Sequence, residues 1–192
     1  MVAIKLANGY LFLATYLACI MKGFVFVPIN PEQKEAETQY ILSRIKPNFF
    51  LDDEKELTSL EKTVTKEPDF NTLGKETSAI FFTSGTTGLP KGVCHSIYNL
   101  SSNVIAFNEA LSLSSATRLY HILPMSYMAG FLNSFLSPIL AGGMVLIGPK
   151  FNPIEAMSFW NMPKQWNANT IWITPTIASF LVRMNRDKEI SE

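Results

Sequence analysis

The sequence predicts an α/β fold in which a mostly parallel sheet carries helices on both faces. Short apolar runs alternate with helix-like patterns along almost the whole chain, as expected for parallel strands joined by crossover helices. Residues 24–29 and 79–82 are continuously apolar, which is typical of strands buried on both faces. Hydrophobic residues make up 47% of the 192-residue chain, enough for a substantial core and too many for a disordered protein.

The first predicted elements are a strand and a buried helix. Residues 2–6 predict a short strand, and Asn8 with Gly9 predicts the turn that follows it. Residues 10–21 are apolar on every side of a helix, so we expect a buried helix that Gly23 terminates.

A second strand and an amphipathic helix come next. Residues 24–29 form the predicted strand, and Asn30 is placed to cap the following helix, with Pro31 at its first position and Gln33 at the spacing of a capping box. One apolar stripe runs along this helix: Ala36, Tyr40, Ile41 and Ile45. Pro47 stops the helix, and residues 48–51 predict a third short strand.

A polar stretch separates these elements from the rest. Residues 52–76 are predicted to form this connection, with one surface helix around residues 54–64. A strand at 79–83 then leads into a loop over residues 84–92. The remaining predicted elements are a helix at 99–111, a strand at 119–123, a helix at 130–140, a strand at 144–147, a helix at 153–166, a strand at 170–174 and a helix that starts after Pro175.

Charge and cysteine content exclude several classes of protein. Sixteen basic and sixteen acidic residues give no net charge, which excludes a nucleic-acid binder held by bulk charge. Residues 31–76 hold 18 of the 32 charges and residues 77–182 only six, so we expect the second stretch to be buried or to lack its covering partner. Residues 119–149 carry no charge, but glycines and prolines interrupt them, so we expect no membrane-spanning segment. Two cysteines, Cys19 and Cys94, fit a reducing, cytoplasmic compartment.

The most informative segment is residues 83–93, which read TSGTTGLPKGV. Three glycines let the backbone approach a ligand closely, and four hydroxyl groups precede one lysine with no acid between them. Clustered N–H and O–H donors with one cation suit a polyphosphate, whereas the bland alternative is a polar surface turn. A P-loop needs Gly-Lys-Ser/Thr in succession, and here Pro90 precedes Lys91 and Gly92 follows it. No Gly-x-Gly-x-x-Gly pattern is present, which argues against a nicotinamide cofactor.

Residues 83–93 resemble the AMP-binding signature of the adenylate-forming superfamily, which includes acyl-CoA synthetases and peptide-synthetase adenylation domains. Residues 123–131, which read LPMSYMAGF, are similar to the fourth core motif of that superfamily. Residues 18–23 together with 27–31, and residues 141–143 and 172–176, resemble other family signatures, so the similarity extends over nearly the whole chain.

The resemblance implies an ATP-dependent reaction in two steps. A carboxylate attacks the α-phosphorus of Mg²⁺-ATP to give an acyl-adenylate, and a thiol, usually coenzyme A, then takes the acyl group. The loop is implied to bind the β- and γ-phosphates: hydroxyls from Thr83, Ser84, Thr86 and Thr87, backbone N–H groups from Gly85 and Gly88, and a charge from Lys91. Such a transition state needs positioning and charge neutralisation more than side-chain chemistry.

The fourth motif places Tyr127 and Gly130 at the implied substrate pocket, with a core tyrosine as the alternative for Tyr127. The family commonly has His or another aromatic residue at the Tyr127 position. His95 and His121 are interpreted as structural, and Cys94 as a small buried residue. The apolar, aromatic content of residues 119–147 favours a fatty or other apolar acid as substrate.

Later motifs of the family, which supply the acid for Mg²⁺, the ribose ligand and a catalytic lysine, do not appear in the sequence. We therefore expect residues 1–192 to be a part of the large N-terminal domain, with no catalytic residue or metal ligand of its own, inactive alone and prone to self-association. Two alternatives stay open: a module that loads a fatty or amino acid onto a carrier protein, and a non-catalytic remnant of the fold. The absence of an acid at Met125, Ser126 and Tyr127 argues against an amino-acid substrate.

Overall fold

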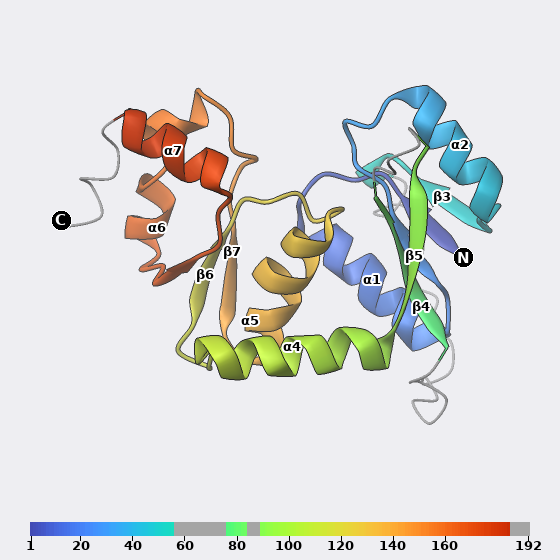
Figure 1. Cartoon of the computed structure of the whole chain (residues 1–192), viewed down its shortest axis with the longest axis horizontal. Coiled ribbons are helices and arrows are strands. Elements are labelled where there is room, and N and C mark those ends of the chain that lie inside the picture. The colour runs from blue at the N-terminus through green and yellow to red at the C-terminus, as the bar shows by residue number, and fades with distance from the viewer. Residues whose placement is uncertain (56–75, 84–88, 185–192) are drawn as a thin grey trace. The chain divides into compact units, whose positions relative to one another are not determined.

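The computed structural model describes residues 1–55, 76–83 and 89–184. The chain divides into two compact units, Met1–Ser102 and Asn103–Glu192, which are described separately here. Both units are α/β, and their sheets are mostly parallel, as the alternating pattern predicts (Figure 1). The strands form two sheets, one in each unit, rather than the one sheet that we expected.

The first unit contains a five-stranded sheet in the order β3-β1-β2-β4-β5. Its strands are β1 (Val2–Ile4), β2 (Phe26–Pro28), β3 (Phe49–Leu51), β4 (Thr77–Thr83) and β5 (Lys91–Ser96). The pairs β1–β2, β1–β3 and β2–β4 are parallel, and among the described strands of this sheet only β5 runs antiparallel to its neighbour, β4.

Two helices cover opposite faces of this sheet. Phe26 of β2 makes edge contacts with Phe12 and Tyr16 of helix α1 (Tyr10–Lys22). The next residue, Val27, belongs to a core cluster with Ile41 of helix α2 (Glu35–Ile45). Successive side chains of a strand point to opposite faces, so α1 and α2 lie on different sides, which confirms this part of the prediction.

Helix α1 ends as predicted, but it is not buried all round. Gly23 takes the left-handed conformation, with φ 67°, and its N–H contributes to the closing turn. Phe12, Tyr16 and Cys19 are buried, whereas Tyr10, Leu17 and Met21 are 70%, 45% and 44% exposed. The expectation of a fully buried helix is therefore wrong for this face of α1.

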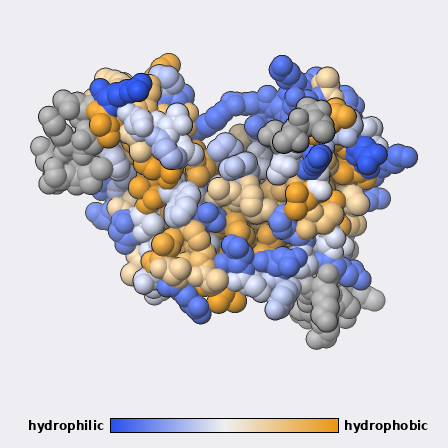
Figure 2. All heavy atoms as spheres, viewed as in Figure 1, coloured by the Kyte–Doolittle hydropathy of each residue, from blue (hydrophilic) through white to orange (hydrophobic). Residues whose placement is uncertain are grey.

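Helix α2 starts four residues later than expected. Asn30 accepts a hydrogen bond from the N–H of Glu32 at 3.0 Å, and its carbonyl accepts one from Gln33 at 2.9 Å. These bonds close a separate turn, so Asn30 does not cap the helix and Pro31 does not begin it. In the predicted apolar stripe Ile41 is fully buried but Ala36 is exposed, and Thr38 is buried instead. Hydrophilic side chains gather around α2 on the face shown in Figure 2.

The second unit is built on a three-stranded parallel sheet in the order β7-β6-β8. The strands are β6 (Arg118–His121), β7 (Met144–Ile147) and β8 (Thr170–Ile171). A π-helix (Ala129–Leu136) continues into α5 (Ser137–Leu140) between β6 and β7. The other helices are α4 (Ile97–Leu111), which contains the boundary between the units, a 3₁₀ turn (Glu155–Ser158), α6 (Asn161–Gln165) and α7 (Pro175–Arg183).

Two predicted elements of this unit are shorter than expected. The helix expected at 153–166 is divided into the 3₁₀ turn and α6, because Pro163 has no N–H to donate to the preceding turn. The strand expected at 170–174 stops at Ile171. Thr174 instead caps α7, accepting a hydrogen bond from the N–H of Ile177 at 3.3 Å, and Pro175 occupies the first helical position.

None of the helices in the described ranges has the length and apolar character needed to span a lipid bilayer.

Candidate phosphate-binding site

The segment that carries the predicted phosphate loop is the connection of a β-hairpin. We expected a loop over residues 84–92, but Lys91 and Gly92 already belong to strand β5. The pairing places Thr83 opposite Lys91, Phe82 opposite Gly92 and Phe81 opposite Val93. This strand was missed because Lys91, Gly92, Val93 and Cys94 are all exposed, so the segment lacks the alternating burial that marks a half-buried strand.

The hairpin brings the two ends of the loop together. The Thr83 hydroxyl lies 3.4 Å from the Lys91 carbonyl oxygen, to which it donates a hydrogen bond. Both residues stand at the carboxyl end of β4, where ligands of α/β sheets commonly bind. The other predicted phosphate ligands, Ser84, Gly85, Thr86, Thr87 and Gly88, lie outside the described residues.

Gly92 fixes how the hairpin packs. A Cβ atom at this position would lie 2.9 Å from Cγ2 of Ile80 and 3.1 Å from the ring of Phe82. Both neighbours are on β4, so the glycine allows close approach of β5 beside the predicted phosphate loop.

A pocket of about 340 Å³ lies beside the base of the hairpin. It is lined by Tyr40, Arg44 and Ile45 from α2, Ile80 and Phe82 from β4, and Pro90, Lys91, Gly92 and Cys94. Among the described residues, two cationic side chains and no carboxylate line it, so this side of the hairpin favours an anion. Sequence reasoning did not include Arg44, because an exposed charge on an amphipathic helix looks like part of a solvated face.

Cys94 and His95, later in β5, differ in their exposure to solvent. Cys94 is an exposed free thiol, so its interpretation as a buried residue is wrong. The ring of His95 lies against Phe81 in an edge contact at 6.0 Å, and partial burial lowers the pKa of His95.

Tyr127 and Gly130, the predicted substrate-pocket residues, share a tight turn in the second unit. The Tyr127 N–H donates to the Pro124 carbonyl at 3.1 Å, and the Tyr127 carbonyl accepts from the N–H of Phe131 at 2.9 Å. A Cβ atom at Gly130 would collide with the carbonyl oxygen of Pro124, so this turn requires glycine. The Tyr127 side chain is 62% exposed, which contradicts the alternative of a core tyrosine.

His121 is held inside the same unit, in the environment of a structural residue. Its side chain is fully buried, and Nδ1 lies 3.2 Å from the Ser134 carbonyl oxygen of the π-helix. Burial lowers the pKa of His121 to about 4, against the opposing effect of its backbone contacts. The imidazole is therefore neutral near pH 7.

Within the ranges that the structure describes, no three His, Cys, Asp or Glu side chains cluster as metal ligands would.

The sequence of the chain matches one protein family and several curated proteins. The family model described as AMP-binding enzyme matches residues 1–192. A dimodular nonribosomal peptide synthase of Bacillus subtilis (strain 168) is 26% identical over 207 residues, covering 97% of this chain and 9% of the synthase. A medium-chain fatty-acid–CoA ligase of Escherichia coli (strain K12) is also 26% identical, covering 79% of this chain and 33% of the ligase.

A solved structure has the same fold. The o-succinylbenzoate CoA synthetase of Bacillus subtilis, in complex with an acyl-adenylate intermediate, superposes with a TM-score of 0.79 at 21% identity. The match covers 95% of this chain and 51% of the synthetase. The chain thus spans about half of that protein and a third or less of these two curated relatives.

Proposed function

The chain belongs to the AMP-binding enzyme family, and from that premise we propose that it takes part in the ATP-dependent activation of a carboxylic acid. The acid displaces pyrophosphate from the α-phosphorus of ATP, giving an acyl-adenylate, and a thiol then displaces AMP. The hairpin carries this proposal, since Thr83 and Lys91 face each other at the carboxyl end of β4 beside a pocket with a second cation, Arg44.

The residues of this site fit a polyphosphate. The Lys91 ammonium and the Arg44 guanidinium line one pocket whose described lining contains no carboxylate, so they stabilise the negative charge of the phosphates and of the departing pyrophosphate. Thr83 adds a hydroxyl at the base of the loop. A Mg²⁺ ion bound to ATP supplies further charge neutralisation, and the described lining of this pocket offers no oxygen anion to hold the ion without the nucleotide.

We propose a fatty or other apolar carboxylic acid as the substrate and coenzyme A as the acceptor. Tyr127 presents an exposed aromatic ring from a turn that Gly130 makes tight. Met125, Ser126 and Tyr127 include no acid that could pair with the ammonium group of an amino acid. The CoA ligase among the relatives supports this choice of acceptor.

A second candidate is the loading of an acyl group onto a carrier protein. It is favoured by the peptide synthase, whose match covers 97% of this chain. The two candidates differ in the thiol that removes the acyl group. Thioester formation with free coenzyme A, measured after adenylate formation by the intact protein, supports the first; transfer only to a phosphopantetheinylated carrier supports the second.

The test of the phosphate site is Lys91→Ala in the intact protein, assayed by carboxylate-dependent ATP–pyrophosphate exchange. Loss of a cation beside the phosphates should cost roughly 2–4 kcal/mol of transition-state stabilisation, about 30- to 1000-fold in rate. Lys34→Ala is the matched control, because Lys34 is an exposed lysine of the same unit outside the pocket lining. If the Lys91 and Lys34 variants both exchange at the parental rate, Lys91 has no role at the phosphates.

A further inference from the structure

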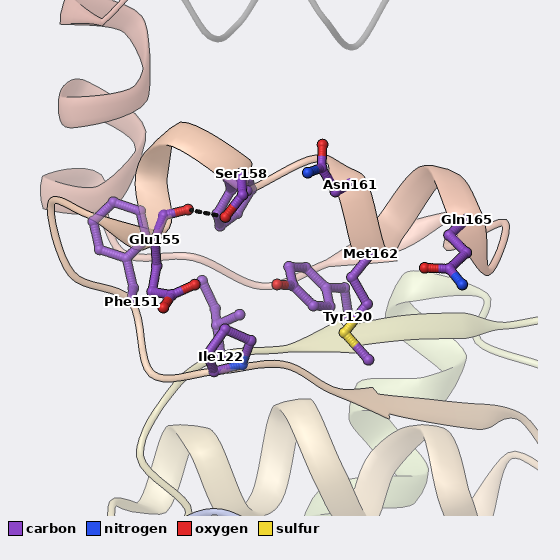
Figure 3. Close-up of a pocket in the computed structure, with 10 residues that line it drawn as sticks. Tyr120, Ile122, Phe151, Glu155, Ser158, Asn161, Met162 and Gln165 are labelled. Atoms are coloured by element: carbon purple, nitrogen blue, oxygen red, sulfur yellow. Dashed lines mark hydrogen bonds between the residues drawn. The ribbon is translucent and has the colours of Figure 1, made fainter.

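The second unit contains a pocket that the proposed reaction does not use. It has a volume of about 260 Å³ and lies between the end of β6, the 3₁₀ turn and α6 (Figure 3). Its lining is Tyr120, Ile122, Pro149, Phe151, Glu155, Ser158, Phe159, Asn161, Met162 and Gln165. In Figure 3, Glu155 and Phe151 lie at one end, Met162 and Gln165 at the other, and Tyr120 between them.

The aromatic wall of this pocket is held in place. The ring of Tyr120 meets Phe159 edge-on at 5.6 Å, and Phe151 meets Phe159 in the same way at 5.8 Å. Gly148, which precedes the lining residue Pro149, packs so closely that a Cβ atom there would collide with the Tyr120 ring. Such packing leaves the wall little freedom to collapse into the empty volume.

Glu155 is fixed by its backbone and supplies the charge of the pocket. Its N–H donates to Oδ1 of Asn152 at 3.0 Å, and its carbonyl accepts from the Ser158 hydroxyl at 3.4 Å. The side chain is half-buried, and in the described part of the chain no Lys, Arg or His forms an ion pair with its carboxylate. The lining residues that the structure describes include no basic side chain. A half-buried carboxylate without a basic neighbour among the described residues attracts a cation.

Tyr120 reinforces this preference for a cation. Burial and, secondarily, the Glu155 carboxylate raise the pKa of the Tyr120 phenol, which keeps the hydroxyl neutral. The pocket therefore has one negative charge, a neutral phenol and the aromatic rings of Phe151 and Phe159, whose faces attract organic cations.

We propose that this pocket binds a small organic ammonium ion, with its head group at Glu155 and its alkyl body along Tyr120 toward Met162. The charge of the pocket disfavours phosphates, carboxylates and coenzyme A, so the site is separate from the proposed reaction. A ligand in this pocket is nevertheless connected to the proposed substrate pocket, because β6 continues through Ile122 into the turn that holds Tyr127.

Three probes that share one carbon skeleton test the proposal on the 192-residue chain: n-butylammonium, n-butanol and butyrate. Binding is followed by Trp fluorescence, because Trp160 packs edge-on against Phe159 at 4.7 Å, and by NMR shifts of the Tyr120 ring. We expect saturable binding of n-butylammonium, at least about tenfold weaker binding of n-butanol and none of butyrate.

Glu155→Gln keeps the shape of the side chain and removes its charge, and it should weaken n-butylammonium binding about tenfold. Glu109→Gln is the matched control, since Glu109 is an exposed carboxylate of the same unit that does not line the pocket. Saturable binding that only the Glu155 variant weakens supports the proposal. Equal affinity for all three probes, equal effects of the two variants, or no saturable binding by the parent chain overturns it. ATP–pyrophosphate exchange by the intact Glu155 variant shows separately whether the phosphate site is intact.

Discussion

At the scale of single residues, His121 makes the stability of the second unit depend on pH. Its folded-state pKa is about 4, below the ordinary 6.5, so the unfolded chain takes up a proton first as the pH falls. The stability that depends on neutral His121 is complete above pH 6.5 and is lost as the pH falls toward 4. Between about pH 7.5 and about pH 5 this amounts to about 2 kcal/mol.

Urea unfolding of the parent chain and of His121→Gln at both pH values measures this contribution. The parent should lose about 2 kcal/mol more than the variant, whose side chain does not titrate. His95→Gln is the control, because His95 is less buried and should leave most of the pH dependence unchanged. Parallel pH profiles for the parent and His121→Gln would contradict the assignment.

Tyr127 governs which acid is accepted, if its exposed ring lines the acyl pocket. Tyr127→Ala should change the ranking of kcat/KM across acids of increasing chain length, with little change in the KM for ATP, because a ring that lines the acyl pocket would contact the acyl chain rather than the nucleotide. Tyr98→Ala is a suitable control, since Tyr98 is also an exposed tyrosine, at 67%. An unchanged ranking of acids in the intact protein would remove Tyr127 from the pocket.

At the level of elements, the β4–β5 hairpin depends on Gly92. Gly92→Ala forces a methyl group against Ile80 and Phe82, and we expect a loss of about 1–2 kcal/mol in unfolding free energy. The same strain should weaken ATP binding, because Lys91 is the adjacent residue. Gly9→Ala is the control, since the nearest neighbour of a Cβ there is 3.9 Å away. Equal stability of the two variants in urea would show that the hairpin tolerates the methyl group.

Elements that follow local rules were predictable from the sequence, and those set by tertiary contacts were not. Gly23 ends α1 and Pro175 begins α7, because a left-handed φ and a first-turn proline are local requirements. Strand β5 was missed because its side chains are exposed and only pairing with β4 defines it. The start of α2 was misplaced because Asn30 uses its capping oxygen for a separate turn.

In the candidate site, too, residues within a local motif were predictable, and residues brought in by tertiary contacts were not. The motif in residues 83–93 was sufficient to select Thr83 and Lys91, which the hairpin places opposite each other. Arg44 could not be selected, since it is 47 residues from Lys91 in the chain and only the packing of α2 against the sheet brings it to the same pocket. The acidic pocket at Glu155 was equally hidden, because it depends on the break of the predicted helix between Ser158 and Asn161.

At the scale of the whole molecule, helix α1 exposes several apolar side chains to solvent. Tyr10, Leu17 and Met21 are exposed at positions 0, 7 and 11 of the helix, a spacing that puts them on one side. Phe24 and Phe49 are also exposed and contact each other edge-on at 6.3 Å. Exposed apolar side chains of this kind favour association, because burying them removes apolar area from water.

We therefore expect the 192-residue chain to self-associate with rising concentration. Sedimentation velocity across a concentration series should show an increasing average sedimentation coefficient. The double change Tyr10→Lys and Leu17→Lys should shift this association to at least about tenfold higher concentration, because it places two charges in the apolar surface. Ile105→Lys is the control, since Ile105 is 56% exposed but lies on α4. A parent chain that stays monomeric throughout the series would show that the apolar side of α1 does not mediate contacts, and equal shifts from the double variant and Ile105→Lys would place the contact elsewhere.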